Sequence, residues 1–302
     1  MRTFVSRLTA AASHLALWAS LYVTGAVVCF AQLADGGEWT RLRWVSLAYA
    51  FVTAATVYLL DRVKLRDRWL DPADREAHPE RFGFMERHSS AVRALAALLG
   101  AASLWLGWML SPVGPVLTVG ACVGVVAYAG WPRKRRARIK DVFLVKNGFV
   151  GAGITTFAGV VMVMGEGLGR SPADVREMVL ARWPVLAYAG AQVFLRVFAD
   201  AAVCDLDDEH ADRSYRTATL PTHLGRFVAW NVATGIRISL GIALLAIPVG
   251  PTPARIAWGG LTIASTLALR WWNPTRVREP VDGRLAVEAL AATLIELAVK
   301  AF

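Results

Sequence analysis

Three aspartates, Asp205, Asp208 and Asp212, have a spacing that could support chemistry. Steps of three and four residues put the three carboxylates on one face of a helix. Like charges this close repel one another unless a cation lies among them, and Mg²⁺ takes carboxylate and phosphate oxygens while keeping several waters. The spacing therefore predicts a magnesium site that bridges the protein to a diphosphate. A solvated acidic loop is the alternative that this segment alone leaves open.

A second acidic segment follows an apolar run earlier in the chain. Asp61 stands at the end of that run, and Asp67 and Asp71 follow at i, i+4 spacing. On a continuous helix the three would span an arc of about 120°, so we expect them to face one cavity and supply further metal ligands. Two alternatives stay open. Asp67 could pair with a nearby Arg, and Asp71-Pro72-Ala73-Asp74 is also a signature of a helix N-terminus.

Long apolar runs must position these acids. The chain has 302 residues, of which 56% are hydrophobic and only 19% charged, and it contains 12 Trp. A bilayer core needs roughly 20 apolar residues per helix. Residues 1–302 therefore read as a single all-α integral membrane domain, a bundle of nine transmembrane helices with two acidic helical loops. The nine predicted runs are 14–33, 44–60, 91–110, 113–131, 142–164, 183–203, 227–248, 254–272 and 284–302.

The basic residues predict the orientation of this bundle. Lys and Arg number 33 against 23 acids, a net charge of +10, and most of them lie in connections that share a side with the N-terminus if nine helices alternate. The positive-inside rule then puts the N-terminus and the acidic loops, 61–90 and 204–226, in the cytoplasm, in a bacterial inner membrane. Nucleic acid is not needed to explain the charge. On the outer side, Ser171-Pro172-Ala173-Asp174 predicts the start of a short interfacial helix.

The second acidic loop carries a resemblance to a known family. Asp205-x-x-Asp208-x-x-x-Asp212, followed by Thr219-Leu220-Pro221, resembles the UbiA superfamily of membrane prenyltransferases. Tyr128, the basic run 133–136 and Lys140-Asp141 are similar to the Tyr and Lys-Arg segment of that family. The resemblance covers nearly the whole chain.

The first acidic loop departs from the family pattern Asn-Asp-x-x-Asp-x-x-x-Asp. If Asp67 and Asp71 are its last two acids, the preceding pair falls on Val63 and Lys64, so a cation stands where a carboxylate is usual. Asp61, one turn earlier, could substitute for it. The departure bears on the number of metals and on the outcome of the reaction more than on the fold.

The resemblance implies an enzyme that ionises an allylic isoprenyl diphosphate with Mg²⁺ and transfers the prenyl group to an aromatic or lipid acceptor in the membrane. The metal ligands would be six aspartates of the two loops, of which all but Asp61 are candidate catalytic residues: Asp61, Asp67, Asp71, Asp205, Asp208 and Asp212. Cations would stabilise the charge that develops on the leaving diphosphate. The candidates for those cations are Lys64, Arg68, Lys140 and Lys146.

Two other functions compete with prenyl transfer. The altered first loop favours a UbiA-type terpene cyclase as the alternative, in which the carbocation is captured within the same molecule. A non-catalytic transporter or lipid-binding protein is the second, although coupled transport normally places ionisable groups near the membrane midplane.

Inside the sixth predicted helix, Arg196 and Asp200 are four residues apart, and we expect them to form a buried ion pair.

Overall fold

The computed structural model describes residues 11–35, 41–66, 70–129, 141–168, 170–274 and 276–301, and every regular element in them is a helix. Each of the nine predicted runs falls on one of the long helices, and the other two helices, α4 and α9, are short. The all-α prediction is confirmed. The helices are α2 (Leu17–Asp35), α3 (Arg41–Val63), α4 (Pro72–Ala77), α5 (Pro79–Leu110), α6 (Val113–Ala129), α7 (Val145–Glu166), α8 (Pro172–Ser214), α9 (Leu220–Leu224), α10 (Arg226–Ala246), α11 (Thr252–Trp272) and α12 (Arg278–Ala301).

Six helices in the described part of the chain are long and apolar enough to cross a membrane: α2, α3, α5, α7, α8 and α10. Helix α6 is apolar but shorter, and α11 and α12 do not combine the length and hydropathy of the six. The count of nine spans therefore stays a prediction.

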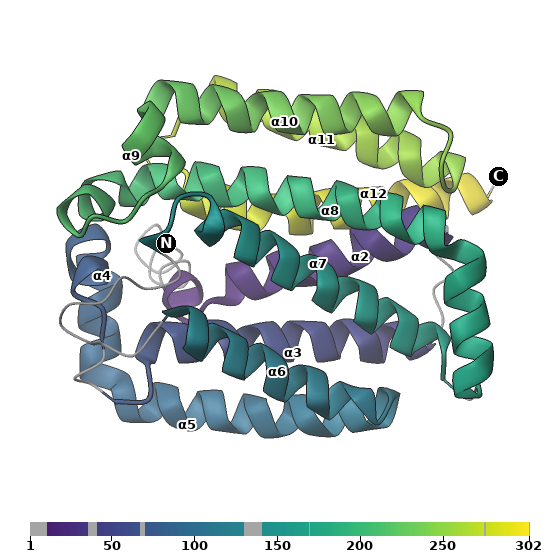
Figure 1. The fold of residues 1–302 in the computed structure, drawn as a ribbon, viewed down its shortest axis with the longest axis horizontal. Helices are drawn as coiled ribbons and strands as arrows, with labels where there is room; N and C mark the ends of the chain where they lie inside the picture. The colour runs from purple at the N-terminus through teal and green to yellow at the C-terminus, as the bar shows by residue number, and fades with distance from the viewer. Residues whose placement is uncertain are drawn as a thin grey trace.

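The long helices lie side by side, and the short helices α4 and α9 lie together at one end of the bundle (Figure 1). The same end, on the left of the view, holds the end of α8 and the beginnings of α7 and α12. Residues far apart in the sequence, from three long helices and from the segment around α4, therefore meet at this end.

Helix α8 differs in length from its prediction. Ser171 begins it with a reciprocal capping box, in which the Ser171 side chain accepts from the Asp174 backbone and the Asp174 side chain accepts from that of Ser171. This confirms a helix start after Ser171, but the expected short helix continues into the next one through Pro184. Helix α8 bends in its first part (Figure 1). A proline inside a helix removes one backbone hydrogen bond and kinks the axis. Helix α8 then continues well past residue 203, to Ser214, so Asp205, Asp208 and Asp212 lie on a membrane helix and not on a loop.

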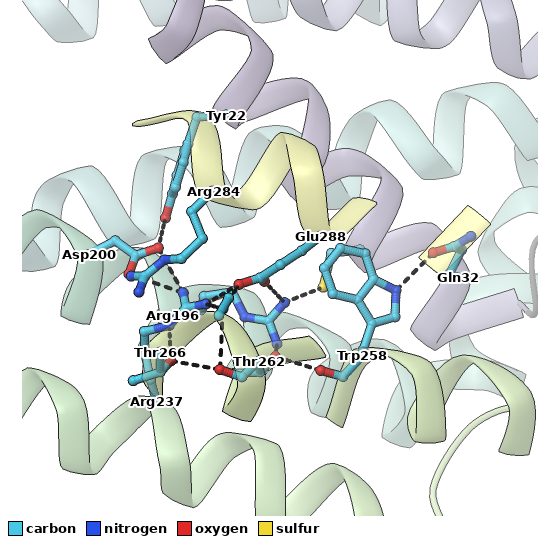
Figure 2. A network of polar contacts seen from close by, with 12 residues as sticks. Tyr22, Gln32, Arg196, Asp200, Arg237, Trp258, Thr262, Thr266, Arg284 and Glu288 are labelled. Atoms are coloured by element: carbon cyan, nitrogen blue, oxygen red, sulfur yellow. Dashed lines mark hydrogen bonds and ion pairs between the residues drawn. The ribbon is translucent and has the colours of Figure 1, made fainter. Parts of the chain in front are cut away.

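A set of buried charges joins α2, α8, α10, α11 and α12 inside the bundle (Figure 2). We call the following residues the inner network: Tyr22, Arg196, Asp200, Arg237, Arg284 and Glu288. The Arg237 guanidinium donates to both carboxylate oxygens of Asp200, at 3.0 and 2.8 Å. The hydroxyl of Tyr22 donates to Asp200 at 2.8 Å, and Arg284 also donates to it.

The predicted ion pair between Arg196 and Asp200 is wrong in its partners. Arg196 pairs with Glu288, 3.6 Å away, and donates to Thr262 at 2.6 Å, whereas Asp200 pairs with Arg237 and Arg284. Both residues are buried, as expected. Each has an opposite charge on another helix, and such pairs also tie the helices together, which a pair within one helix does not.

Candidate active site

The three aspartates of α8 surround one ammonium group. Lys146 Nζ lies 2.7 Å from Asp205 Oδ1, 3.6 Å from Asp212 Oδ2 and 3.9 Å from Asp208 Oδ2. Lys146 stands in the first turn of α7, which packs along α8, so its long side chain reaches across to the acidic face. The structure therefore brings four of the predicted site residues together at the end of the bundle.

Asp208 has two further partners, neither of which was predicted. Arg278 Nη2, from the start of α12, lies 2.5 Å from Asp208 Oδ2, and His78 Nε2, from just before α5, lies 2.9 Å from Asp208 Oδ1. The same His78 nitrogen is 3.1 Å from Arg278 Nη1. One ring nitrogen can donate to a carboxylate or accept from a guanidinium, but it cannot do both at once. Burial lowers the pKa of His78 and outweighs the opposing hydrogen bond to Asp208.

The neighbouring acid, Asp207, fixes α12 at the site. Its carboxylate accepts from the backbone amides of Val277, at 3.2 and 3.0 Å, and Arg278, at 2.9 Å. An acceptor at this position satisfies amides that have no partner within the helix and complements the positive end of the helix dipole. Asp207 therefore holds the beginning of α12 against α8, which places Arg278 beside Asp208.

The first acidic loop is arranged differently. Lys64 Nζ lies 2.6 Å from Asp61 Oδ1, so the lysine that stands in place of a family carboxylate pairs with the nearest acid. Asp71 begins α4, and its side chain accepts from Ala73 N at 3.2 Å, which confirms the N-cap alternative for its local structure. Asp67, Arg68 and Lys140 lie outside the described residues, so their predicted roles stay predictions.

The donor atoms at the α8 site suit a hard divalent cation. Asp205 and Asp212 are buried, and the Oδ2 atom of each has no hydrogen-bond partner. Buried carboxylate oxygens normally find donors, and a magnesium ion coordinates oxygens of this kind. In the described part of the chain, however, no three His, Cys, Asp or Glu side chains already converge on a point that could hold a metal ion. The residue types fit Mg²⁺, but the side chains have to move to bind it.

Sequence reasoning missed His78 and Arg278 for identifiable reasons. Their contacts with Asp208 join residues 130 and 70 positions apart, and neither residue belongs to a recurring spacing. The one available signal for His78 was its place inside the acidic segment 61–90. For Arg278 no sequence signal existed, because its position depends on how Asp207 caps α12.

This chain is similar in sequence to one protein family and in fold to several solved structures. A model of the UbiA prenyltransferase family matches residues 73–286. The apo structure of a UbiA homologue from Aeropyrum pernix K1 resembles the fold with a TM-score of 0.63 at 16% identity, over 92% of this chain and 98% of that one. The structure of a UbiA homologue from Archaeoglobus fulgidus bound to DMAPP and Mg²⁺ resembles it with a TM-score of 0.59 at 13% identity, over 94% and 99%. A search of curated proteins finds no match.

At these identities the solved structures establish the fold alone. The family match is independent of them and covers most of the chain, including α8 with its three aspartates and the start of α12. Together with the six apolar helices, it identifies the chain as an integral membrane protein that belongs to the UbiA prenyltransferase family.

Proposed function

We propose that this protein is a Mg²⁺-dependent enzyme that ionises an allylic isoprenyl diphosphate and transfers the prenyl group to an aromatic or lipid acceptor. The observation that carries the proposal is the set of three aspartates on one face of α8, with two buried carboxylate oxygens that lack hydrogen-bond donors. The UbiA homologue bound to DMAPP and Mg²⁺ supports this choice of substrate class and metal.

Asp205, Asp208 and Asp212 would hold Mg²⁺, which supplies positive charge to the departing diphosphate when bound. Lys146 lies among them, and Arg278 contacts Asp208, so both cations can reach diphosphate oxygens bound at the same place. Guanidinium and ammonium groups bind phosphate oxygens through charge-assisted hydrogen bonds. Asp61, Asp67 and Asp71, with Lys64, Arg68 and Lys140, would complete the site from the first loop and the segment before α7.

The apolar prenyl chain would lie among the helices next to aromatic side chains. Tyr128 of α6 and Phe149 of α7 stack with ring centroids 4.7 Å apart, and Phe149 lies one turn beyond Lys146. Aromatic faces stabilise nearby positive charge, as a developing allylic cation requires. The site end of the bundle would face the cytoplasm, in agreement with the distribution of basic residues.

The test is pyrophosphate release by the purified protein from geranyl, farnesyl and geranylgeranyl diphosphates, with and without Mg²⁺, followed by mass spectrometry of the products. We expect metal-dependent release that is lost in Asp208→Asn and kept in Glu209→Gln. Glu209 is the matched control, because it is the next residue of α8 but pairs with the exposed Arg213. Absence of turnover with every chain length and a panel of acceptors would contradict the enzyme proposal.

The Asp61–Lys64 pair favours one second candidate, a UbiA-type terpene cyclase. In this pair a cation stands where the transferase pattern has a carboxylate, and it neutralises the neighbouring acid. The same assay separates the two. Cyclic hydrocarbon or terpene alcohol formed from diphosphate alone indicates cyclisation, and dependence of the prenylated product on an added acceptor indicates transfer.

A further inference from the structure

Lys146 occupies the space between the carboxylates that the proposed function assigns to a metal. Its ammonium is within 4 Å of all three aspartates, and its side chain is only 19% exposed. Mg²⁺ requires its oxygen ligands at about 2.0–2.1 Å in near-octahedral geometry. An ammonium held among the same oxygens therefore competes with the metal for position and for charge.

Arg278 and His78 compete with a metal for Asp208 in the same way. Both contact Asp208 from the side of α12 and α5, whereas Lys146 approaches from α7. Donors on both sides hold the carboxylates in an arrangement that has no preformed three-ligand metal site within the described residues. To ligate a metal, Asp208 has to give up or redirect these hydrogen bonds.

The charges of Lys146, Arg278 and the three aspartates indicate which ligand would free the carboxylates from their cations. The three aspartates carry three negative charges, and Lys146 and Arg278 carry two positive ones. A divalent cation arriving alone would crowd two half-buried cations that lose their partners, which is unfavourable in a site partly shielded from water. A diphosphate arriving with the metal offers the ammonium and the guanidinium new anionic partners.

We propose that Lys146 and Arg278 are internal counter-ions, which hold the aspartates while the site is empty and move to the diphosphate when it binds. The inference rests on the proposed function and adds an order to it, since the divalent metal binds tightly only together with the diphosphate. Lys146 and Arg278 are then substrate-binding residues that also control the affinity of the site for the metal. Free divalent metal from the surrounding water does not bind tightly unless the diphosphate is present.

The proposal predicts an unusual effect of removing a positive charge. Lys146→Met should bind Mn²⁺ alone more tightly than the native protein by at least about tenfold, because the competing ammonium is gone. The same variant should bind inorganic pyrophosphate more weakly at a fixed free Mn²⁺ concentration, again by about tenfold. A merely structural lysine would change neither affinity in this opposed way.

The experiment uses the full chain in detergent, with Mn²⁺ as the probe. Free Mn²⁺ is measured by electron paramagnetic resonance, and retention of radiolabelled inorganic pyrophosphate by equilibrium dialysis. Lys300→Met is the matched control, because Lys300 pairs with Glu296 at the far end of α12 and is half exposed. Arg278→Met is the second variant. It should also raise the affinity for Mn²⁺ alone, so the proposal stays testable if Lys146→Met fails to fold.

Tight binding of Mn²⁺ alone by the native protein, equal to that of both variants, would overturn the inference and leave the proposed enzyme intact. Weaker Mn²⁺ binding in both variants would overturn it as well, since the two cations would then support the metal site. If no protein binds Mn²⁺ with or without pyrophosphate, the metal site itself is wrong and both proposals fall.

Discussion

Helix α8 contributes to two charged clusters that differ in the sign of their excess charge. In the inner network, three guanidiniums face two carboxylates, Asp200 and Glu288. In the site cluster, which consists of Lys146, Asp205, Asp208, Asp212, His78 and Arg278, three carboxylates face two permanent cations. The inner network therefore carries one excess positive charge and repels a divalent cation. The site cluster carries one excess negative charge, and in our proposal it admits a divalent cation only together with a diphosphate that draws Lys146 and Arg278 away.

The two clusters also differ in their contact with water. The charged side chains of the inner network are at most 6% exposed, whereas in the site cluster Lys146 is 19%, Asp208 15% and Arg278 22% exposed, and Asp205 alone, at 2%, is as buried as the inner network. Buried polar atoms without a hydrogen-bond partner do not distinguish the two clusters. The Nε atoms of Arg196 and Arg284 in the inner network lack partners, as do the Oδ2 atoms of Asp205 and Asp212 in the site cluster. The sign of the excess charge combined with access to water, and not burial of charge alone, therefore distinguishes the site cluster from the inner network that holds the helices together.

The largest expected effect comes from neutralising one carboxylate of the site cluster. Asp205→Asn should lower the rate of pyrophosphate release by roughly 10²–10³-fold, because one ligand of the leaving-group metal is lost. The unfolding temperature should change little, since an amide still accepts from Lys146. Steady-state kinetics and thermal unfolding in detergent check both parts. A native rate in this variant would remove Asp205 from the site.

The second effect is on stability. Glu288→Gln should destabilise the protein by about 3–5 kcal/mol, because Arg196 and Arg237 lose a buried counter-charge. Activity per folded molecule should be kept, since the residue lies away from the aspartates of the site cluster. The measurement is thermal unfolding followed by the rate of the fraction that remains folded. A stable but inactive variant would show that the inner network also takes part in the chemistry.

A smaller effect is expected at Asp207, which joins α8 to the beginning of α12. Asp207→Ala should cost about 0.5–2 kcal/mol through loss of the α12 cap. It should also raise KM for the diphosphate, because Arg278 is no longer held in place. Ser171→Ala, which removes the cap at the other end of α8, should cause a similar loss of stability without a change in KM.

The smallest effect is expected at the end of the bundle opposite the site. Arg182 pairs there with Asp35 at 3.0 Å and Glu166 at 2.7 Å, all partly exposed. Asp35→Asn should cost less than about 1 kcal/mol, because exposed ion pairs contribute little in water. Kinetics should be unchanged. A large loss of activity would mean that this end is coupled to the site along α8.

The sequence predicted the features that depend on local spacing. The nine apolar runs follow from the length of the apolar stretches, and each falls on a helix of the structure. The shared face of Asp205, Asp208 and Asp212 follows from helical periodicity, because all three lie on α8. The Asp71-Pro72 pair signalled a helix start, which the structure also contains.

Features that depend on packing between helices could not be predicted in this way. Arg196 and Asp200 stand at ion-pair spacing, yet each reaches a partner on another helix, because long side chains choose among all neighbouring charges. Arg278 enters the site only because Asp207 holds the start of α12. Lys146 could be placed near the acids, but its position among three carboxylates required the packing of α7 on α8.

The polar face of α12 has a consequence for how the protein is made. Its Arg284, Glu288 and Glu296 are buried against α2, α8, α10 and α11, all of which precede α12 in the chain. Charged side chains are costly to expose to lipid, so α12 is poorly suited to enter a bilayer unaided. Helices are delivered to the membrane in the order of synthesis, so the partners of these three residues on other helices are already present when α12 emerges. Insertion of α12 then follows that of its four partner helices, and it brings Arg278 to Asp208.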